Sequence, residues 1–447
     1  MEEPSNDSTR VRSLSDFPEH LLLHILSFLP TLDAIQTSFV CRKWRHLWSS
    51  LPFLHFSHTL FPSSNSPSET RRSFTDFVDR TLILRSLFPL LQFHLQFDYA
   101  ENRYASHVDS WIRYAIAHNV LDLDLDFFEE RDFEYYDDDH DDDDHVYYSF
   151  PFSVLRNGRV RVLKLSCCDL SLPTNMSVKH FFSLRSMSLC KIYLTDQMVS
   201  DILKACVNLE ALHFEHNWGM KDVKIFSSKL RKLSLKGLSC DEGSVEIYAP
   251  NLCSLNIVCF QVGKYTLRGA VSLVEANVAL PYYSHWSKVV RLLGHVHRLA
   301  VGNRWFELLA SKNVPSERFV LHNLKFLDLW TGYSNTDMLG VAALLERSPN
   351  LEMMTINYCF KLCIGEKKSS AEELFNVPIN FSSPSLREVK IKSFKGTAGE
   401  LRFVRLLEKQ GAVLEKIVLV PAKGCEISLD GLKELKLSKD ILHIQQF

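Results

Sequence analysis

The chain has 447 residues, of which 46% are hydrophobic and 23% charged, a composition that supports a large buried core. It excludes a disordered chain and a membrane-spanning one, and only 16 glycines and 16 prolines exclude collagen-like or low-complexity architecture. The formal net charge is −2, but 14 acidic residues and one arginine lie between Asp122 and Asp144. The rest of the chain is therefore net positive, and the total charge does not identify a partner.

The amino-terminal residues are polar and have no apolar core followed by a small-residue cleavage site, so we expect no secretory signal. No run reaches the 18 apolar residues that a transmembrane helix needs. The 11 cysteines are odd in number and include no CxxC pair, which favours reduced, mostly buried thiols. These features predict a cytoplasmic or nuclear protein that does not contact a membrane.

Residues 15–49 show apolar residues at helical spacing. One stripe is predicted to form a first helix, capped by Ser15 or Asp16, and a short second helix spans 33–39. A third helix carries a similar stripe. The members of the two stripes are Leu21, Leu22, Ile25, Leu26 and Leu29, then Val40, Cys41, Trp44, Leu47 and Trp48. So small a unit cannot bury all these faces, so it docks on another protein or packs on its own chain; the pattern leaves both open.

The same segment resembles an F-box, the three-helix module that binds the Skp adaptor of Skp–cullin–F-box ubiquitin ligases. The matching residues are Phe17 to Pro30, Asp33, and Val40-Cys41-Arg42-Lys43-Trp44-Arg45, with Phe17-Pro18 where Leu-Pro is usual. We place this module at 11–58. The resemblance implies that the adaptor contacts Pro18, Leu21, Leu22, Ile25, Leu26, Leu29, Pro30, Ile35, Val40, Cys41, Trp44 and Leu47.

A pattern of apolar residues at positions 1, 4 and 6 recurs 13 times. The copies begin at Leu90, Val120, Val160, Leu184, Leu209, Leu230, Leu252, Leu273, Val296, Leu324, Leu351, Leu386 and Leu414. Intervals of 21 to 28 residues between Val160 and Leu324 fit the leucine-rich repeat. Each copy is a strand that cannot cover its own apolar face, so the copies stack. We predict an α/β fold in which an irregular leucine-rich-repeat solenoid (74–377) has a parallel β concave face and convex helices such as 195–206 and 337–346.

Three further segments connect or extend the repeats. Residues 59–73 are predicted to be a Ser/Pro linker, followed by a helix that covers the open end of the solenoid with Phe74, Phe77, Val78, Thr81 and Leu82. Residues 127–147 are predicted to be an acidic loop; His140 and His145 within it suggest divalent cations, but the spacing lacks the glycine turn and bidentate glutamate of an EF-hand. A solvated, self-repelling insertion is the favoured interpretation.

Residues 378–425 resemble the FBD module that follows the repeats in a large plant family. The resemblance rests on Pro384 to Ile391, on 396–411 and on Val413-Leu414-Glu415-Lys416-Ile417. Taken with the F-box and the repeats, it identifies the chain as a member of the plant F-box/FBD/leucine-rich-repeat family. Residues 426–447 fit that pattern least well, and their structure stays open.

Strand alternation predicts that positions 3, 5 and 7 of each copy face outward. These positions include Asp122, Asp124, Asp126, His213, Glu215, Lys232, Lys236, Arg298, Phe326, Asp328 and Trp330. From them we take Phe326, Asp328, Trp330, His213, Lys232 and Arg298 as candidate substrate-binding residues. Two outward aromatics on one strand suggest anchors for a recruited protein, although a neighbouring loop could instead cover them as a secondary core.

No Walker loop, GxSxG, HExxH or Rossmann fingerprint occurs, so we expect no enzyme, no cofactor and no metal. Basic residues are too dispersed, and the acidic loop too repulsive to phosphate, to favour nucleic acid. The resemblance implies a substrate-recognition adaptor that binds a Skp-type subunit, through it a cullin, and an unidentified protein substrate. Two alternatives remain: a scaffold or inhibitor that binds the adaptor without delivering substrate, and a small-ligand receptor of the same architecture.

Overall fold

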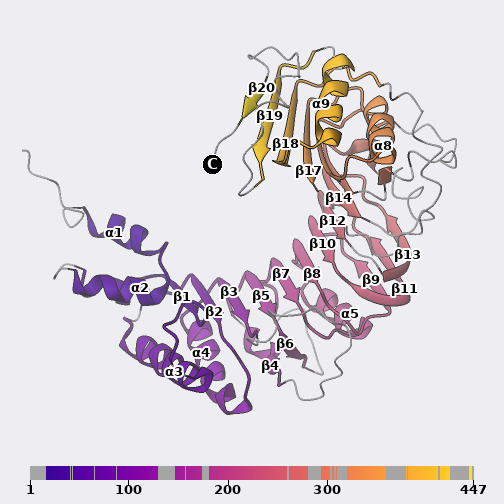
Figure 1. The fold of residues 1–447 in the computed structure, drawn as a ribbon. Coiled ribbons are helices and arrows are strands. Elements are labelled where there is room, and N and C mark those ends of the chain that lie inside the picture. Colours follow the sequence, from indigo (N-terminus) through magenta and orange to yellow (C-terminus); the bar gives the residue numbers. More distant parts are fainter. Residues whose placement is uncertain are drawn as a thin grey trace, which may run out of the picture. The chain divides into compact units, whose positions relative to one another are not determined.

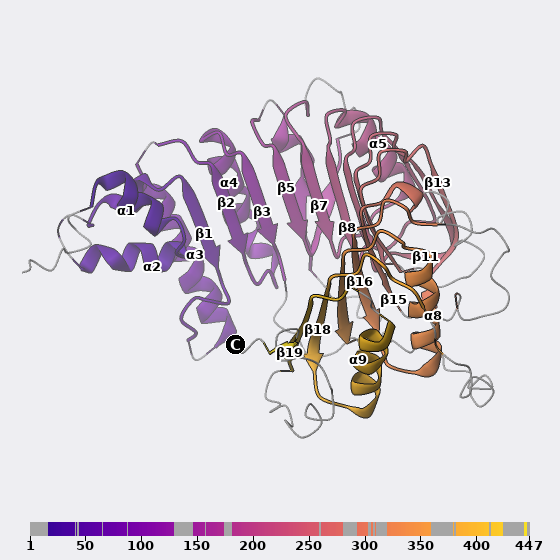
Figure 2. The ribbon, with the colours of Figure 1, turned by 90° about the horizontal axis from the view of Figure 1, so that it is seen from above.

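The structure is a computed structural model. It describes residues 17–447 apart from 41, 43, 65, 87, 129–145, 157, 174–180, 259–260, 280–292, 303–304, 307–308, 310–319, 359–378, 380, 411–412, 423–441 and 445–447. The chain divides into two compact units, Met1–Leu209 and Glu210–Phe447, which we call the first and second units (Figures 1 and 2).

The first unit begins with short helices and continues as a parallel sheet. Its helical segment, residues 17–51, contains α1 (Glu19–Leu26), α2 (Thr31–Gln36) and the 3-10 turns η2 (Thr37–Phe39) and η3 (Leu47–Ser50). The strands of its main sheet are β1 (Phe53–Ser57), β2 (Gln92–Gln96), β3 (Asp122–Asp126), β5 (Val162–Ser166) and β7 (Ser186–Cys190). The remaining elements are α3 (Pro67–Leu84), η4 (Asn102–Tyr104), α4 (Ala105–Ala117), the paired strands β4 (Tyr148–Pro151) and β6 (Cys168–Ser171), η6 (Phe152–Leu155) and α5 (Asp196–Ala205).

One face of this sheet is covered and the other is open. Figure 1 shows α3 and α4 on the same side of β1, β2 and β3. In β3, Leu123 and Leu125 are buried on the covered face, while Asp122, Asp124 and Asp126 alternate with them on the open face. The outward positions predicted from alternation are therefore confirmed here.

The helical segment is fixed to the first strands by hydrogen bonds. The buried Arg85 guanidinium at the end of α3 donates to the Leu51 carbonyl oxygen at 2.8 Å and to the Phe88 carbonyl oxygen at 2.9 Å. The His55 backbone N–H in β1 donates to Thr31 Oγ1 at 2.7 Å. Burying a guanidinium is costly unless it is hydrogen-bonded, so the bonds that Arg85 makes, together with the Thr31 bond, favour one arrangement of α2, β1 and α3.

The second unit is built on a longer parallel sheet. Its strands, in spatial order, are β8 (Ala211–Glu215), β10 (Lys232–Lys236), β12 (Ser254–Val258), β14 (Glu275–Ala279), β15 (Arg298–Gly302), β16 (Phe326–Thr331), β17 (Met353–Tyr358), β18 (Glu388–Phe394), β19 (Lys416–Pro421) and β20 (Leu442–Ile444). The other elements are β9 (Asp222–Phe226), β11 (Ser239–Tyr248), β13 (Gln261–Arg268), η8 (Leu293–His295), α8 (Asn335–Glu346) and α9 (Ala398–Gln410). The predicted α/β architecture of stacked parallel strands is confirmed.

Helices cover only part of the second unit's sheet. α8 and the first unit's α5 match the helices expected at 337–346 and 195–206. Between them in the chain, a second sheet, in the order β13-β11-β9, lies beside β8, β10 and β12 (Figure 1). The repeats starting at Leu209, Leu230 and Leu252 are only 21 or 22 residues long, too short for a helix with two connections. Their returning segments alternate with a period of two, as in the eBeBe burial of β9, and so form strands.

The predicted linker and capping helix are corrected by the structure. Leu51, Leu54 and Phe56 form a further copy of the repeat pattern, and β1 pairs in parallel with β2. α3 begins at Pro67, inside the segment predicted as linker 59–73, because the Ser66 Oγ accepts the Glu69 backbone N–H at the helix start. The predicted apolar face of α3 does point inward, since Phe74, Val78 and Leu82 are buried. However, α3 connects β1 to β2 over the covered face of the sheet and is not a cap on the end of the solenoid.

The other predicted segments are only partly described. Of the acidic loop 127–147, residues 129–145 lie outside the described residues, while Phe127 and Phe128 are buried and belong to the fold. The FBD-like region contains β18, α9 and β19, and β20 in the segment left open pairs with β19. Ser15, Asp16 and Cys41 also lie outside the described residues.

A substitution at Gly340 can test how closely α8 packs against its neighbours. A Cβ at Gly340 would lie 2.4 Å from the Phe306 Cα, whereas one at Gly294 would meet nothing within 4 Å. We expect Gly340→Ala to lower the free energy of unfolding by about 1–3 kcal/mol through overpacking, and Gly294→Ala to change it by less than about 0.5 kcal/mol. Urea unfolding of both variants measures the difference; equal stabilities would contradict this packing.

Candidate functional site

The helical segment has a small core of its own. Six buried side chains form it: Leu22, Leu26, Ala34, Trp44, Leu47 and Leu51, with Leu23 and Trp48 packed against them. Trp44 and Leu26 therefore point inward, toward residues of the same chain. This core accounts for part of the apolar surface that the sequence could not assign.

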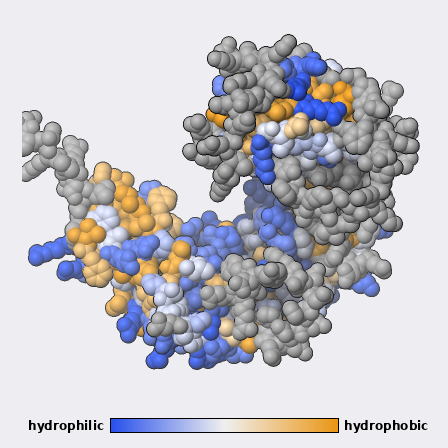
Figure 3. All heavy atoms as spheres, viewed as in Figure 1, coloured by the Kyte–Doolittle hydropathy of each residue, from blue (hydrophilic) through white to orange (hydrophobic). Residues whose placement is uncertain are grey.

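The same segment leaves a second set of apolar side chains exposed. Phe28 is 75% exposed and Phe39 86% exposed, and Figure 3 shows hydrophobic residues gathered over α1. The exposed set is Phe17, Leu21, Ile25, Phe28, Leu29, Phe39 and Val40, which we call the apolar patch. Large exposed apolar patches mark sites that other molecules cover.

The predicted adaptor contacts divide between the core and the patch. Leu22, Leu26, Trp44 and Leu47 are buried within the chain, where their side chains stabilise the helices that carry the patch, and their contact with an adaptor stays a prediction. Pro18 and the patch residues Leu21, Ile25, Leu29 and Val40 are accessible, Pro30 and Ile35 are half-buried, and Cys41 is outside the described residues. Phe28 and Phe39 were missed; Phe28 follows the end of α1, and Phe39 lies in η2, so neither belongs to a helical stripe that the sequence pattern could identify.

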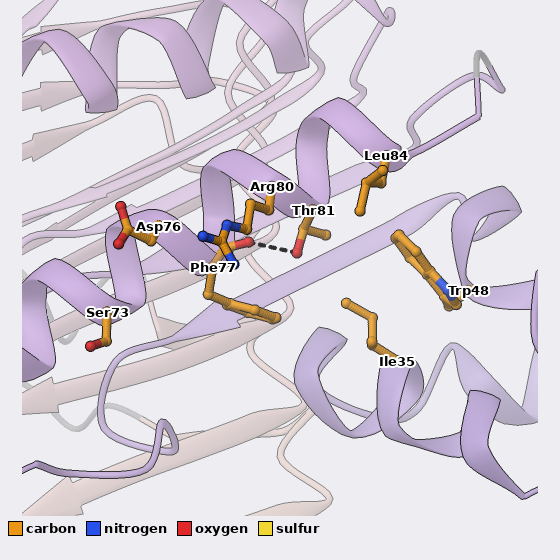
Figure 4. Close-up of a pocket in the computed structure, with 8 residues that line it drawn as sticks. All are labelled: Ile35, Trp48, Ser73, Asp76, Phe77, Arg80, Thr81 and Leu84. Carbon is orange, nitrogen blue, oxygen red and sulfur yellow. Dashed lines mark hydrogen bonds between the residues drawn. The ribbon is translucent and has the colours of Figure 1, made fainter.

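A pocket of about 420 Å³ separates the helical segment from α3. Figure 4 shows Ile35 and Trp48 on one side and Phe77 and Leu84 of α3 on the other. Ser73, Asp76, Arg80 and Thr81 complete the lining. The walls are mainly apolar, and the pocket explains why Ile35 and Trp48 are only partly covered by their own chain.

The open face of the first unit carries a polar ladder across four strands. Asp124 Oδ2 lies 3.3 Å from His94 Nδ1 and 3.0 Å from Lys164 Nζ, and the His94 ring centroid is 4.4 Å from that of His55. Beside it, the Gln96 side chain accepts from the Ser57 hydroxyl at 2.7 Å and donates to Asp126 at 3.3 Å. These neighbouring-strand contacts hold the register of β1, β2, β3 and β5.

The electrostatics of the ladder differ from one carboxylate to the next. Burial raises the pKa of Asp124, but hydrogen bonds and charges from His94 and Lys164 outweigh it and leave the pKa below its usual value. Burial, reinforced by the Asp124 charge, raises the pKa of Asp122 and of Asp126. Burial and the neighbouring His94 lower the pKa of His55. His94 and Lys164 therefore stabilise the charge of Asp124, whereas burial dominates at Asp122 and Asp126.

The six candidate substrate residues fall into two groups on the second unit's open face. Arg298, Phe326, Asp328 and Trp330 lie on the adjacent strands β15 and β16. His213 and Lys232 lie on β8 and β10, so five strand steps, about 24 Å, separate His213 from Asp328. The structure therefore does not bring the six residues together in one site.

The group on β15 and β16 is internally connected. The Arg298 guanidinium lies 3.2 Å from Asp328 Oδ2 and stands over the Phe326 ring, 4.7 Å from its centroid. Cation–π contact and the ion pair together hold Phe326 and Asp328 in place. Trp330, at the end of the strand, takes part in neither contact and stays exposed.

The group on β8 and β10 is weakly held. Lys236 Nζ lies 3.7 Å from Glu215 Oε2, a pair that is exposed on both sides. Burial, followed by the charges of Lys236 and Lys232, lowers the pKa of His213. Arg298 is three strand steps, about 14 Å, from these lysines, so the three cations do not line one small-ligand pocket.

Within the described residues, no group of three or more His, Cys, Asp or Glu side chains is placed to hold a metal ion, and His140 and His145 lie outside that set. No helix in the described part of the chain is both long and apolar enough to cross a bilayer.

Comparison with known proteins matches both parts of the chain. Residues 14–56 match the F-box domain, and residues 85–431 match the leucine-rich-repeat domain of At1g61320/AtMIF1. The F-box/FBD/LRR-repeat protein At2g04230 of Arabidopsis thaliana is 34% identical over 283 residues, 61% of this chain and 59% of that protein. The F-box/LRR-repeat protein At5g02910 of the same plant is 27% identical over 357 residues, 77% and 71% of the two chains. The apolar patch thus lies inside the F-box match.

The polar ladder predicts that the stability of the fold depends on pH through Asp124, and that substituting Lys164 shifts this dependence. Asp124 stabilises the fold above its ordinary pKa of about 3.9, and this stabilisation is lost as the pH falls through its lowered folded pKa. We expect Lys164→Met to raise the Asp124 pKa, so that the stabilisation is lost at a higher pH. NMR titration of the carboxyls measures this, with Asp169, whose pKa is raised by burial alone, as the internal control. An unmoved Asp124 would contradict the assignment.

Proposed function

This chain belongs to the F-box/leucine-rich-repeat proteins, and we propose that it acts as the substrate-recognition subunit of a Skp–cullin–F-box ubiquitin ligase. An F-box implies binding to a Skp-type adaptor, and through it to a cullin. The repeats then hold a target protein within reach of the ubiquitin-charged enzyme. The chain supplies proximity: tethering raises the effective concentration of a target lysine, and no residue of this chain reacts.

The observation that carries the proposal is the apolar patch. The segment already has a six-residue core, and the patch remains outside it, within the F-box match. Exposing side chains as large as Phe28 and Phe39 is unfavourable unless another surface covers them. We propose Leu21, Ile25, Phe28, Leu29, Phe39 and Val40 as the adaptor contacts, with Pro18 at their edge.

The attachment of the segment supports the same proposal. Arg85 and Thr31 tie the helical segment to β1 and α3, so an adaptor on the patch would be held at a fixed position relative to the first strands. A fixed connection restricts the volume that a target bound to the first unit can explore, which favours transfer. The repeat sheet offers an open face of protruding side chains for the target.

Adaptor binding is tested by changing the patch and leaving the core intact. We expect Leu21→Asp combined with Ile25→Asp to weaken retention of a purified Skp-type adaptor at least about tenfold, because both charges would be buried against it. The melting temperature stays within a few degrees of the native value because Leu21 is 40% and Ile25 39% exposed and neither belongs to the six-residue core. Quantitative pull-down and differential scanning calorimetry give the two readings.

Val271→Asp is the matched control, an equally apolar-to-charged change at a 71% exposed position of the second unit. It should leave adaptor retention unchanged. Full retention by the Leu21/Ile25 double variant would show that the adaptor, if bound, uses another surface, and the proposed contact set would be wrong.

The double variant also separates a ligase subunit from a scaffold or inhibitor. We expect the native chain to copurify the cullin together with the adaptor, and the double variant to lose both but still capture the target, in larger amounts because it is no longer degraded. Deleting residues 1–58 would also remove the F-box, but it would be a less specific test than the double variant, because it removes β1 and exposes the edge of β2. A native chain that retains the adaptor without the cullin would favour the scaffold.

A further inference from the structure

One aromatic side chain on the second unit's open face is uncovered. Trp330 is 47% exposed at the end of β16, whereas Phe326 on the same strand is half-buried and lies under the Arg298 guanidinium. Exposed indoles are among the side chains that contribute most when a partner covers them. Trp330 is therefore the natural anchor of this face.

The neighbours of Trp330 explain why its indole is open. Its register partner on β15 is Gly302, which has no side chain, and its partner on β17 is Asn357. Among the described residues, a Cβ built on Gly302 would have only the Trp330 carbonyl oxygen, at 3.9 Å, within 4 Å, so this part of the chain leaves space beside Trp330. A side chain of another protein can lie in that space, against the ring.

The charge beside Trp330 is positive. Lys392 follows Asn357 in the same row of the sheet, and Lys390 stands in the next row with Asp328. Asp328 is already held by Arg298 at 3.2 Å, and among the described residues no carboxylate lies within 4 Å of the Lys392 ammonium. Glu388 is four residues away along β18, about 13 Å. The row of Trp330 thus pairs an open aromatic with an unneutralised cation.

We propose that this row, Gly302, Trp330, Asn357 and Lys392, docks an extended acidic segment of the recruited protein, a proposal that rests on the substrate-recognition function above. An apolar side chain of that segment lies on the indole beside Gly302, and a carboxylate pairs with Lys392. Charge complementarity selects an acidic segment over a basic one, since the only carboxylate next to Trp330 on its own strand is occupied.

The geometry also gives the spacing of the two residues. Trp330 and Lys392 are two strand steps apart, about 10 Å. A polyproline II segment places residues i and i+3 on one side at about 9.3 Å, whereas a β-strand offers about 6.6 Å or about 13 Å. The docked segment therefore has an apolar residue and an Asp or Glu three residues apart in an extended, proline-compatible conformation.

The test uses the full chain bound to its adaptor and a bead-displayed library of proline-rich 12-residue peptides. Two positions vary over all residue types, and their separation is two, three or four. We expect an apolar residue with Asp or Glu at a separation of three to be enriched about fivefold over the same peptide with Lys or Arg, and the preference to fall in high salt. No enrichment, or enrichment of basic peptides, would overturn the proposal.

Variants locate the preference on this row. Trp330→Ala should reduce peptide retention about tenfold or more, and Gly302→Val should do the same by filling the space beside the ring. Lys392→Glu should reverse the preference from acidic to basic peptides. Tyr248→Ala, at a 48% exposed aromatic of the second sheet, is the matched control and should change nothing. Equal effects of Trp330→Ala and Tyr248→Ala would overturn the proposal.

Two further readings separate the alternatives. Binding of the adaptor to the native chain is measured in the same samples. If the chain selects acidic peptides but does not bind the adaptor, only the ligase function is contradicted. If it binds the adaptor but selects no peptide, only this docking site is contradicted. A fluorescent twelve-nucleotide oligo(dT) is offered in parallel, because an aromatic next to lysines can also stack bases. Tighter, Trp330-dependent binding of the oligonucleotide than of any peptide would replace the peptide site by a nucleic-acid site.

Discussion

The packing of six side chains in the helical segment determines which apolar residues remain outside it. Trp44, Leu47 and Leu51 pack on Leu22 and Leu26, and this fixes the rotation of α1 about its axis. Leu21, Ile25 and Phe28 then point away from the chain. A different rotation would bury the patch and expose the core, so the proposed contact with the adaptor depends on this packing.

In the repeats, the pairing of the parallel strands likewise determines which side chains remain exposed. Because successive side chains alternate, burying Leu327 and Leu329 in β16 places Phe326, Asp328 and Trp330 on the open face. The register then decides their neighbours, and Trp330 has Gly302 on one side and no large side chain on the other. The same rule in the first unit places Asp122, Asp124 and Asp126 on the open face, where Asp124 pairs with Lys164 at 3.0 Å.

Much of the fold could be predicted because its signals are local. A copy such as Leu324, Leu327 and Leu329 identifies a strand and its buried face without any long-range information. The choice between Leu21 and Leu22 could not be predicted, since adjacent residues both lie within a wide apolar stripe and only tertiary packing selects one. β1 was missed because Leu51, Leu54 and Phe56 follow the F-box motif directly, and the distance from His213 to Trp330 required the strand order.

The most direct test of the central claim is radical footprinting of the chain with and without a purified Skp-type adaptor, read by mass spectrometry at single residues. We expect the adaptor to protect Leu21, Ile25 and Phe28, while Leu22 and Leu26 are labelled slowly in both states because the chain already buries them. Unchanged labelling of the three exposed side chains in a complex known to have formed would contradict it.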